Sequence, residues 1–370
     1  EVIVVVLFVL KVLFITIQDF NSIPNGGVQG SLRNFHAIRE LTGPKNIRVI
    51  GLLSSKKEAG VDKIRKWVNF LRGYPTGTSS AVMAQILDES RSYDMVFLDA
   101  SNYGVIARHL RRNGYIGRVI VYFHNIEYRI ALQNAKSRPT GFWKVLIAKY
   151  NERLSVLNSD RQVFISRRDE ELASKLYRVG AYSIISASLP DRYPGRSNND
   201  KEPGHEAKLH CLFVGSGWWP NVHGINWFLE HVMPNVDVRL TIIGRGIEAG
   251  VRIFGENVNL VGTVNDLSVY YEAADVVVCP IFLGGGMKIK VCEALMHGKT
   301  ILGTKEAFAG FELDFDEVGA LCESADDFIT KLNALSKRRG YVKFNPYSRK
   351  IYLDRYSEMA TSKAFRDLFA

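Results

Sequence analysis

The sequence predicts an α/β protein with two doubly wound, Rossmann-like domains that face each other across a cleft. Apolar runs of strand length alternate with helical stretches along the whole chain, which is typical of parallel sheets covered by helices. A polar segment interrupts this alternation near the middle, and glycines follow several of the strands. At 370 residues the chain is also longer than one ordinary domain.

The first domain is expected over residues 1–190. Its apolar runs are bounded by turn residues, as in buried parallel strands. The predicted strands are Lys11–Thr16, Ile47–Leu53, Met95–Asp99, Val119–Phe123, Gln162–Ile165 and Tyr182–Ile185. The predicted helices are Gly30–Leu41, Gly104–Arg112 and Phe142–Leu157. Asp94 and Asp99, which bracket the third strand, are expected to be ordinary strand-end residues.

The second domain is expected over residues 209–346, after a linker at 191–208 that is rich in Pro, Gly, Ser, Asn and charge. Residues from about 347 to 370 are expected to form a helix that packs back on the first domain. The predicted strands are Leu209–Val214, Val238–Ile243, Val258–Leu260, Val276–Pro280 and a run around Ile301 and Leu302. The predicted helices are Val269–Ala274 and Ala325–Leu335, and Leu313–Asp316 is expected in a loop.

Composition narrows the class of protein. The net charge of +10 indicates an anionic partner, such as a nucleotide or an anionic lipid. The basic residues are dispersed and form no nucleic-acid-binding module, so no nucleic-acid partner is expected. Four widely separated cysteines fit buried, reduced thiols in a cytosolic protein, and no Cys/His spacing indicates zinc.

The start of the chain is strongly apolar. Val2–Leu10 carries no charge, but Lys11 interrupts the run before it reaches the length of a membrane span, so no transmembrane helix is expected. Val2–Leu10 is then an appendage that touches a membrane, a signal remnant, or the start of the fold.

The most informative stretch is the turn Gly284–Gly286, between a predicted strand and a predicted helix. Consecutive glycines let the backbone approach a ligand, and the helix N-terminus favours an anion such as phosphate. Lys288 and Lys290 begin this helix, and Glu293 shares a helix face with Lys290, so a phosphate and sugar hydroxyls can be held together. The alternative is a tight connection followed by an ordinary surface ion pair. Gly298 is expected to end the helix rather than to form a P-loop.

With these motifs in view, the second half resembles the GT-B glycosyltransferases, in particular the retaining enzymes of family 4, also called group 1. The matching runs are FVGSGWWPNVHGINWFLEHVMPNV, TIIGRG, the stretch from VNLVGTVNDL to ILGT, and AFAGFEL. The first half matches more loosely, at NGGVQGSLRN, VYFHNIEYR and FISRRDEELASKL.

The resemblance assigns roles to residues of the second half. It implies that Glu293 binds the donor ribose, and that Lys290 and Lys288 meet the donor diphosphate. It also implies that the backbone amides of 285–287, which are Gly285, Gly286 and Met287, contact the sugar and phosphate.

The resemblance also assigns roles in the first half. His124 is similar to a histidine beside the reacting sugar, and Gly26 and Gly27 match a loop that shapes the floor of the cleft. From the residues alone, His124 could equally cap a helix or bond Glu127.

This sequence departs from the family pattern at two places. The first glutamate of the E-x7-E signature is replaced by Gly285, as in a subgroup with the pattern G-x-G-x-[KR]-x-K-x-x-E. The usual Arg and Lys of the first loop of the second domain are absent, and Ser216 and His223 lie near those places. Arg245, in a Gly-Arg-Gly turn, either reaches the nucleotide or is solvated.

The resemblance implies a hexosyltransferase that moves a sugar from a nucleoside-diphosphate sugar to a glycan or lipid-linked acceptor, with retention, in cell-surface polysaccharide or glycolipid biosynthesis. No cofactor and no metal are expected, since amides and lysines can stabilise the leaving diphosphate. The expected location is the cytoplasm, with peripheral binding to the inner membrane as an option. The alternatives are a nucleotide-sugar epimerase or a non-catalytic scaffold subunit with the same fold.

Overall fold

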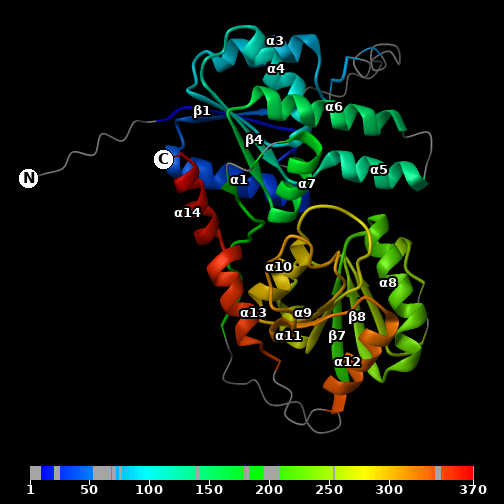
Figure 1. The fold of residues 1–370 in the computed structure, drawn as a ribbon. Helices are drawn as coiled ribbons and strands as arrows, with labels where there is room; N and C mark the ends of the chain where they lie inside the picture. Colours follow the sequence, from blue (N-terminus) through cyan, green and yellow to red (C-terminus); the bar gives the residue numbers. More distant parts are fainter. Residues whose placement is uncertain are drawn as a thin grey trace, which may run out of the picture. The chain divides into compact units, whose positions relative to one another are not determined.

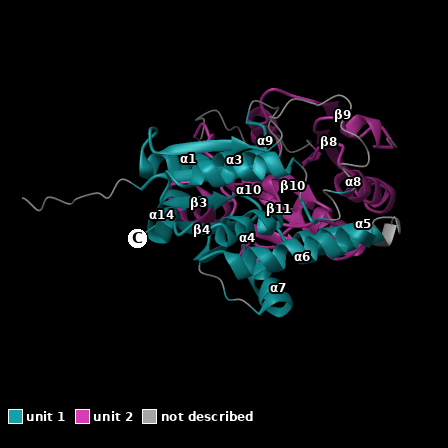
Figure 2. Ribbon diagram, turned by 90° about the horizontal axis from the view of Figure 1, so that it is seen from above, with its two compact units in different colours: residues 1–186, 361–370 teal, residues 187–360 magenta. Residues whose placement is uncertain are grey.

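The computed structural model describes residues 10–20, 26–52, 68, 72–74, 77–137, 142–178, 180, 183–195, 208–252, 255–337 and 343–369 (Figure 1). The chain divides into unit 1, residues 1–186 with 361–370, and unit 2, residues 187–360 (Figure 2). Residues 2–9, Leu53, Tyr182 and most of the expected linker lie outside the described residues.

Unit 1 contains a six-stranded parallel sheet, as the alternation of strands and helices predicts. The strands lie in the order β2-β1-β3-β4-β5-β6. Their bounds are β1 Val12–Thr16, β2 Ile47–Gly51, β3 Met95–Leu98, β4 Arg118–Phe123, β5 Arg161–Phe164 and β6 Ser183–Ile184. Because β1 and β3 are almost wholly inaccessible to solvent, their apolar runs do not alternate with polar residues.

Helices cover both faces of this sheet (Figure 1). Their bounds are α1 Gly26–Thr42, α3 Ser80–Ser90, α4 Gly104–Arg112, α5 Glu127–Ser137, α6 Phe142–Asn158, α7 Arg167–Tyr177 and α14 Glu358–Phe369, with a 3-10 turn at Ser101–Tyr103. On one face Phe14 and Phe97 stack on each other and meet Phe35 of α1 and Phe365 of α14. On the other face Leu13, Ile15 and Val96 belong to a cluster with residues of α3, α4 and α6.

Unit 2 contains a second six-stranded parallel sheet, in the order β12-β11-β10-β7-β8-β9. Its strands are β7 Leu209–Val214, β8 Val238–Ile243, β9 Val258–Gly262, β10 Val276–Cys279, β11 Thr300–Gly303 and β12 Gly319–Leu321. Its helices are α8 Trp219–His231, α9 Ser268–Ala273, α10 Ile289–Met296, α11 Phe315–Val318, α12 Ala325–Lys337 and α13 Pro346–Ile351, with 3-10 turns at Met233–Asn235 and Ile247–Ala249. A short π-helix, Tyr352–Tyr356, follows α13.

We expected residues from about 347 to 370 to pack on the first domain; residues 347–360 are grouped with unit 2, and residues 361–370 with unit 1. Hydrogen bonds explain this grouping: the hydroxyl of Tyr352 donates to the carbonyl of Leu189 at 2.8 Å, and Leu189 forms a β-bridge with Ser357. Leu189 therefore belongs to unit 2, although it lies before the expected linker.

Most predicted elements agree with the structure to within a few residues, and three differ. The helix expected at about 347–370 is divided into α13, the π-helix and α14. Helix α1 begins at Gly26, so Gly26 and Gly27 form its first turn rather than a loop. Asp314 caps a short helix, because its side chain accepts hydrogen bonds from the amides of Asp316 and Glu317. The prediction of a loop at Leu313–Asp316 was therefore wrong for its last two residues, which belong to α11.

All four cysteines are buried and free, as their spacing predicts. Among the described residues, no helix has both the length and the apolar character that crossing a membrane requires.

Helices α4 and α6 pack so closely that only glycine fits at position 104. A methyl group on Gly104 would overlap the carbonyl oxygen of Asn151 and lie 2.5 Å from the amide nitrogen of Ser155. We expect Gly104→Ala to lower the free energy of unfolding by about 2–3 kcal/mol, because the two helix backbones must separate. Urea denaturation measures the change.

The matched control is Gly180→Ala, since nothing lies within 4 Å of a methyl group built there. We expect it to change the free energy of unfolding by less than about 0.5 kcal/mol. Equal stability of the two variants would contradict the close packing of α4 on α6.

Candidate functional site

Both sheets contain a point at which the strand order reverses, and ligands of α/β proteins bind at such points, outside the carboxyl ends of the strands. In unit 2 the reversal lies between β7 and β10, which are neighbours in the sheet. In unit 1 it lies between β1 and β3. The side chains predicted to be functional gather at these two places.

The glycine turn follows β10 and leads into α10. Gly284 has φ +130° and Gly286 φ +59°, conformations that L side chains rarely adopt, which accounts for glycine at both positions. The ammonium group of Lys288 closes the turn: it donates to the carbonyl of Gly286 at 3.0 Å and pairs with the carboxylate of Glu306 at 3.0 Å. Lys288 thus has a carboxylate partner and stabilises the turn.

Lys290, in the first turn of α10, has different partners. Its ammonium donates to the side-chain oxygen of Asn221 at 2.7 Å and lies 4.5 Å from the centre of the Phe213 ring. These partners are neutral, and no carboxylate of the described residues forms an ion pair with Lys290. Burial lowers the pKa of Lys290 to about 8. An anion bound here would supply the missing countercharge.

Asn221 connects Lys290 to the loop after β7. Its side-chain nitrogen donates to the backbone carbonyl of Ser216 at 2.9 Å while its oxygen accepts from Lys290. A methyl group on Gly215 would lie 2.9 Å from the Lys290 ammonium nitrogen, so the loop passes directly against that group. The structure therefore brings Ser216 and Lys290 to one point at the strand reversal.

Glu293 lies one helical turn after Lys290 and is half-buried. Its carboxylate accepts a hydrogen bond from the hydroxyl of Tyr271 at 3.0 Å, and the Tyr271 ring stacks on His297 with the planes 3° apart. Burial raises the pKa of Glu293 to about 7, although Tyr271 and Lys290 oppose this rise. Tyr271 leaves the second carboxylate oxygen of Glu293 for another donor.

The remaining predicted donor residues lie around this point with different exposure. Arg245 is exposed in the turn after β8, and its backbone carbonyl accepts from the amide of Gly217 at 2.9 Å. Met287 is buried, and its sulfur accepts from the amide of Ala187 at 3.4 Å. Gly285 lies between the two strained glycines of the turn.

In unit 1 the strand reversal is occupied by Asp99, which is buried at the carboxyl end of β3. One carboxylate oxygen lies 2.9 Å from Nε2 of His124 and accepts from the side chain of Asn34 at 2.9 Å. The other accepts from the hydroxyl of Thr16 at 3.1 Å. The interpretation of Asp99 as an ordinary strand-end residue was therefore wrong. The sequence did contain a signal for such a role, because Asp99 directly follows a buried strand, where ligand-binding side chains of α/β sheets are found.

A second layer of contacts holds Asn34 in place. The guanidinium group of Arg33 donates to the side-chain oxygen of Asn34 at 2.6 Å and to the hydroxyl of Tyr122 at 2.7 Å. Asn34 and Arg33 are buried although α1 is a surface helix, and sequence reasoning missed both. The ring of His124 lies against Gly30, where a methyl group would come within 3.2 Å of the imidazole. His124 thus bonds Asp99, not Glu127.

Further polar groups lie at this end of unit 1. Gly26 and Gly27 are exposed in the first turn of α1. Among the described residues, the side-chain oxygens of Gln29, Asn102 and Asn125 are buried and have no hydrogen-bond partner within the protein. Because buried polar groups are normally paired, these oxygens can accept hydrogen bonds from a bound hydroxyl compound or from water.

In the described part of the chain, no three His, Cys, Asp or Glu side chains are grouped to hold a metal ion. What the two places offer is a partly buried cation beside a glycine turn in unit 2, and an anchored imidazole in unit 1. The first suits an anion, and the second suits a hydroxyl-bearing compound.

Comparison with solved structures shows the fold. The chain is similar to sucrose-phosphate synthase from Thermosynechococcus elongatus, with 13% identity, a TM-score of 0.73, and coverage of 97% of this chain and 98% of that chain. It is also similar to Anabaena HepE in complex with UDP-glucose, with 13% identity, a TM-score of 0.67 and coverage of 97% and 99%.

A third similar structure is the trehalose-6-phosphate synthase OtsA, with 12% identity, a TM-score of 0.62 and coverage of 96% and 98%. These likenesses show that the chain has the GT-B fold of two Rossmann-like units. No curated protein sequence matches the chain. Residues 208–338, which form most of unit 2, match the family model of the group 1 glycosyl transferases.

Proposed function

We propose that this protein is a glycosyltransferase that moves a sugar from a nucleoside-diphosphate sugar to a hydroxyl group of a glycan or lipid-linked acceptor. The observation that carries the proposal is the ammonium of Lys290, which is partly buried beside a glycine turn with only neutral partners. A diphosphate is the anion that fits a cation at a helix N-terminus. The match of residues 208–338 to the group 1 glycosyl transferases supports this reading.

The donor would be held in unit 2 by groups that act on different parts of it. Lys290 and the amides of the glycine turn would bind the diphosphate, and the free carboxylate oxygen of Glu293 would accept from the ribose hydroxyls. As the sugar leaves, negative charge develops on the diphosphate, and a fixed cation in a poorly solvated site stabilises that charge. This chemistry requires no metal, so we propose a metal-independent reaction.

His124 would contact the sugar that is transferred. The carboxylate of Asp99 lies 2.9 Å from Nε2 and would fix the orientation of the ring. We propose retention of anomeric configuration, with the leaving phosphate oxygen taking the proton of the acceptor hydroxyl.

The product would be a cell-surface polysaccharide or glycolipid, made at the cytoplasmic face of the membrane. Four buried thiols suit a reducing compartment. The HepE structure holds UDP-glucose, which makes uridine nucleotides the first donors to test.

The test of the proposal is a thermal-shift titration against UDP, GDP, ADP, CMP and dTDP, with and without magnesium, followed by a transfer assay with the sugar form of the nucleotide that binds. We expect one nucleoside diphosphate to stabilise the protein, equally with and without magnesium. Lys290→Ala should weaken its affinity roughly 10- to 100-fold, because a charged hydrogen bond to phosphate is lost.

The control is Lys331→Ala, which removes an exposed lysine of α12 in the same unit and should leave affinity unchanged. Unchanged affinity in Lys290→Ala would refute the assigned donor site. Binding of none of the nucleotides would favour the scaffold alternative.

Donor affinity should depend on pH through two groups. The pKa of Lys290 is lowered to about 8, so its positive charge is lost as pH rises through that value. The pKa of Glu293 is raised to about 7, so its ability to accept two hydrogen bonds is lost as pH falls through that value. We expect affinity for the intact nucleotide sugar to be highest between these values, as measured by titration calorimetry.

Two variants distinguish the alkaline decline in affinity from the acidic decline. Lys290→Arg should abolish the alkaline decline, because a guanidinium keeps its charge. Glu293→Gln should abolish the acidic decline while lowering affinity. A wild-type profile without either decline would show that these two groups do not contact the donor.

Asp99 should act as a positioning residue through His124. We expect Asp99→Asn to lower kcat roughly 100-fold, because a neutral amide replaces the carboxylate that orients the imidazole. Affinity for the nucleoside diphosphate should stay unchanged, since Lys290 and Glu293 belong to unit 2. Steady-state kinetics and thermal shifts measure the two quantities.

The control is Asp94→Asn, at the opposite end of β3, where the carboxylate accepts from the amide of Lys11 at 2.8 Å. It should keep kcat within about two-fold, since most substitutions away from a site have small effects. Equal loss of kcat in both variants would indicate a purely structural role for Asp99.

A further inference from the structure

Helix α6 carries several large, exposed apolar side chains. Of the thirteen large hydrophobic residues that are exposed in the described part of the chain, five lie in this one helix: Phe142, Trp143, Leu146, Tyr150 and Leu157. Trp143 is 66% exposed and Leu157 67%. We call these five residues the aromatic face of α6.

Four residues of the aromatic face lie on one side of α6. Trp143, Leu146, Tyr150 and Leu157 fall at helical spacings of three, four and seven, so their side chains project from the same side. The opposite side of α6 is in the core, where Val145, Asn151 and Ser155 are buried. Leu154, between Tyr150 and Leu157, is buried as well. Exposed apolar stripes of this kind mark interaction surfaces in folded proteins.

The exposed charges of α6 are all positive. Lys144, Lys149 and Arg153 are exposed on α6. The one carboxylate of the helix, Glu152, is buried and accepts from the hydroxyls of Ser101 at 2.9 Å and Tyr177 at 2.7 Å. The exposed surface of α6 therefore combines apolar side chains with three cations and no anion.

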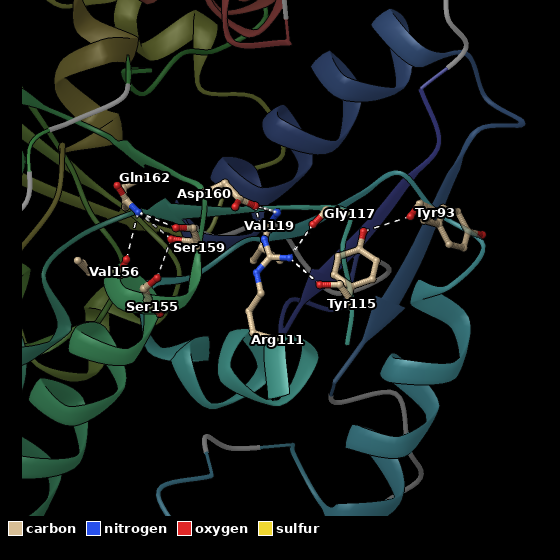
Figure 3. Close-up of polar contacts among 10 residues, drawn as sticks. All are labelled: Tyr93, Arg111, Tyr115, Gly117, Val119, Ser155, Val156, Ser159, Asp160 and Gln162. Atoms are coloured by element: carbon tan, nitrogen blue, oxygen red, sulfur yellow. Dashed lines mark hydrogen bonds and ion pairs between the residues drawn. The ribbon is translucent and has the colours of Figure 1, made fainter. Parts of the chain in front are cut away.

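Helix α4, which packs against α6, extends the positive surface. The guanidinium of Arg108 donates to the hydroxyl of Tyr150 at 2.7 Å, and Arg112 follows one turn later on α4. Arg111 is engaged elsewhere: it donates to the carbonyls of Tyr115 at 2.7 Å and Gly117 at 2.9 Å and pairs with Asp160 (Figure 3).

The contacts in Figure 3 also fix the ends of the two helices to the sheet. Asp160, just after α6, accepts from Arg111 of α4 and from the backbone amide of Val119 in β4 at 2.6 Å. Gln162 donates to the hydroxyl of Ser159 at 2.9 Å. The aromatic face is thus presented by a helix whose position does not depend on a partner.

We propose that the aromatic face of α6 docks on the surface of an anionic lipid bilayer. A helix that lies in the plane of a bilayer buries Trp, Phe and Leu at the headgroup boundary while Lys and Arg bind anionic lipids. The aromatic face and its three cations have this composition. A nucleic acid would use the cations but leave Leu146 and Leu157 without an apolar environment.

A second copy of the chain suits this surface less well. A twofold interface brings the same patch of both copies together. Lys144, Lys149 and Arg153 would then face their own counterparts, with no exposed carboxylate on α6 to compensate them. Charge complementarity therefore favours the anionic bilayer over a homodimer.

The test is sedimentation of the full chain with vesicles of phosphatidylcholine alone or mixed equally with phosphatidylglycerol, at low and high salt. We expect binding to the anionic vesicles that weakens with salt. Trp143→Ser with Leu146→Ser should weaken binding roughly ten-fold or more, because two apolar side chains no longer enter the interface. Lys144→Gln with Arg153→Gln should weaken it roughly five-fold per charge removed.

The matched control is Val269→Ser with Met359→Ser, which removes two exposed apolar side chains of unit 2 and should leave binding unchanged. All variants keep the apolar residues Val2–Leu10, so a change in binding reports α6 alone. Wild-type binding by both α6 variants, or no binding of the wild type to anionic vesicles, would overturn the proposal. So would a wild-type dimer that the apolar double variant converts to a monomer without lipid.

Nucleotide binding separates this inference from the proposed function. Each α6 variant should keep the thermal shift given by the nucleoside diphosphate, since the donor residues lie in unit 2. A chain that binds vesicles through α6 but binds no nucleotide would refute the glycosyltransferase and leave the docking surface standing.

Discussion

The backbone segments at the carboxyl edge of the second sheet approach each other too closely for any side chain to lie between them. A methyl group on Gly224 of α8 would overlap the carbonyl oxygen of Pro280, and one on Gly244 would overlap that of Gly215. This packing brings the start of α8 against the end of β10, and it brings Asn221 to Lys290. The position of the Lys290 ammonium, next to Asn221 and the loop after β7, depends on that approach.

The same topology produces a polar centre in unit 1 by different means. There the strand reversal is filled by the carboxylate of Asp99, whose oxygens accept from Thr16, Asn34 and the ring of His124. One unit thus presents a cation and the other an imidazole fixed by an anion. The sheets share an architecture, whereas the chemistry at each reversal is set by a few side chains on the flanking helices.

The sequence was sufficient to predict the two parallel sheets, because long buried strands such as Val276–Cys279 stand out against polar loops. It also predicted that the glycine turn, Lys290 and Glu293 lie together, since they belong to one contiguous motif. It did not predict the hydrogen bonds of Asp99, which join residues 83, 65 and 25 positions apart in the chain. The sequence also did not show that Lys288 and Lys290 have different partners. Glu306, which pairs with Lys288, lies beyond the next strand.

The near-neutral pKa values of Lys290 and Glu293 have a consequence for the energetics of ligand binding. A diphosphate beside Lys290 would raise the pKa of that ammonium, and the bound protein would then take up protons from solution above about pH 8. Hydrogen bonds from ribose would favour the carboxylate of Glu293, and protons would be released below about pH 7. The heat measured on binding would therefore contain the ionisation heat of the buffer, with opposite sign on the two sides of neutrality.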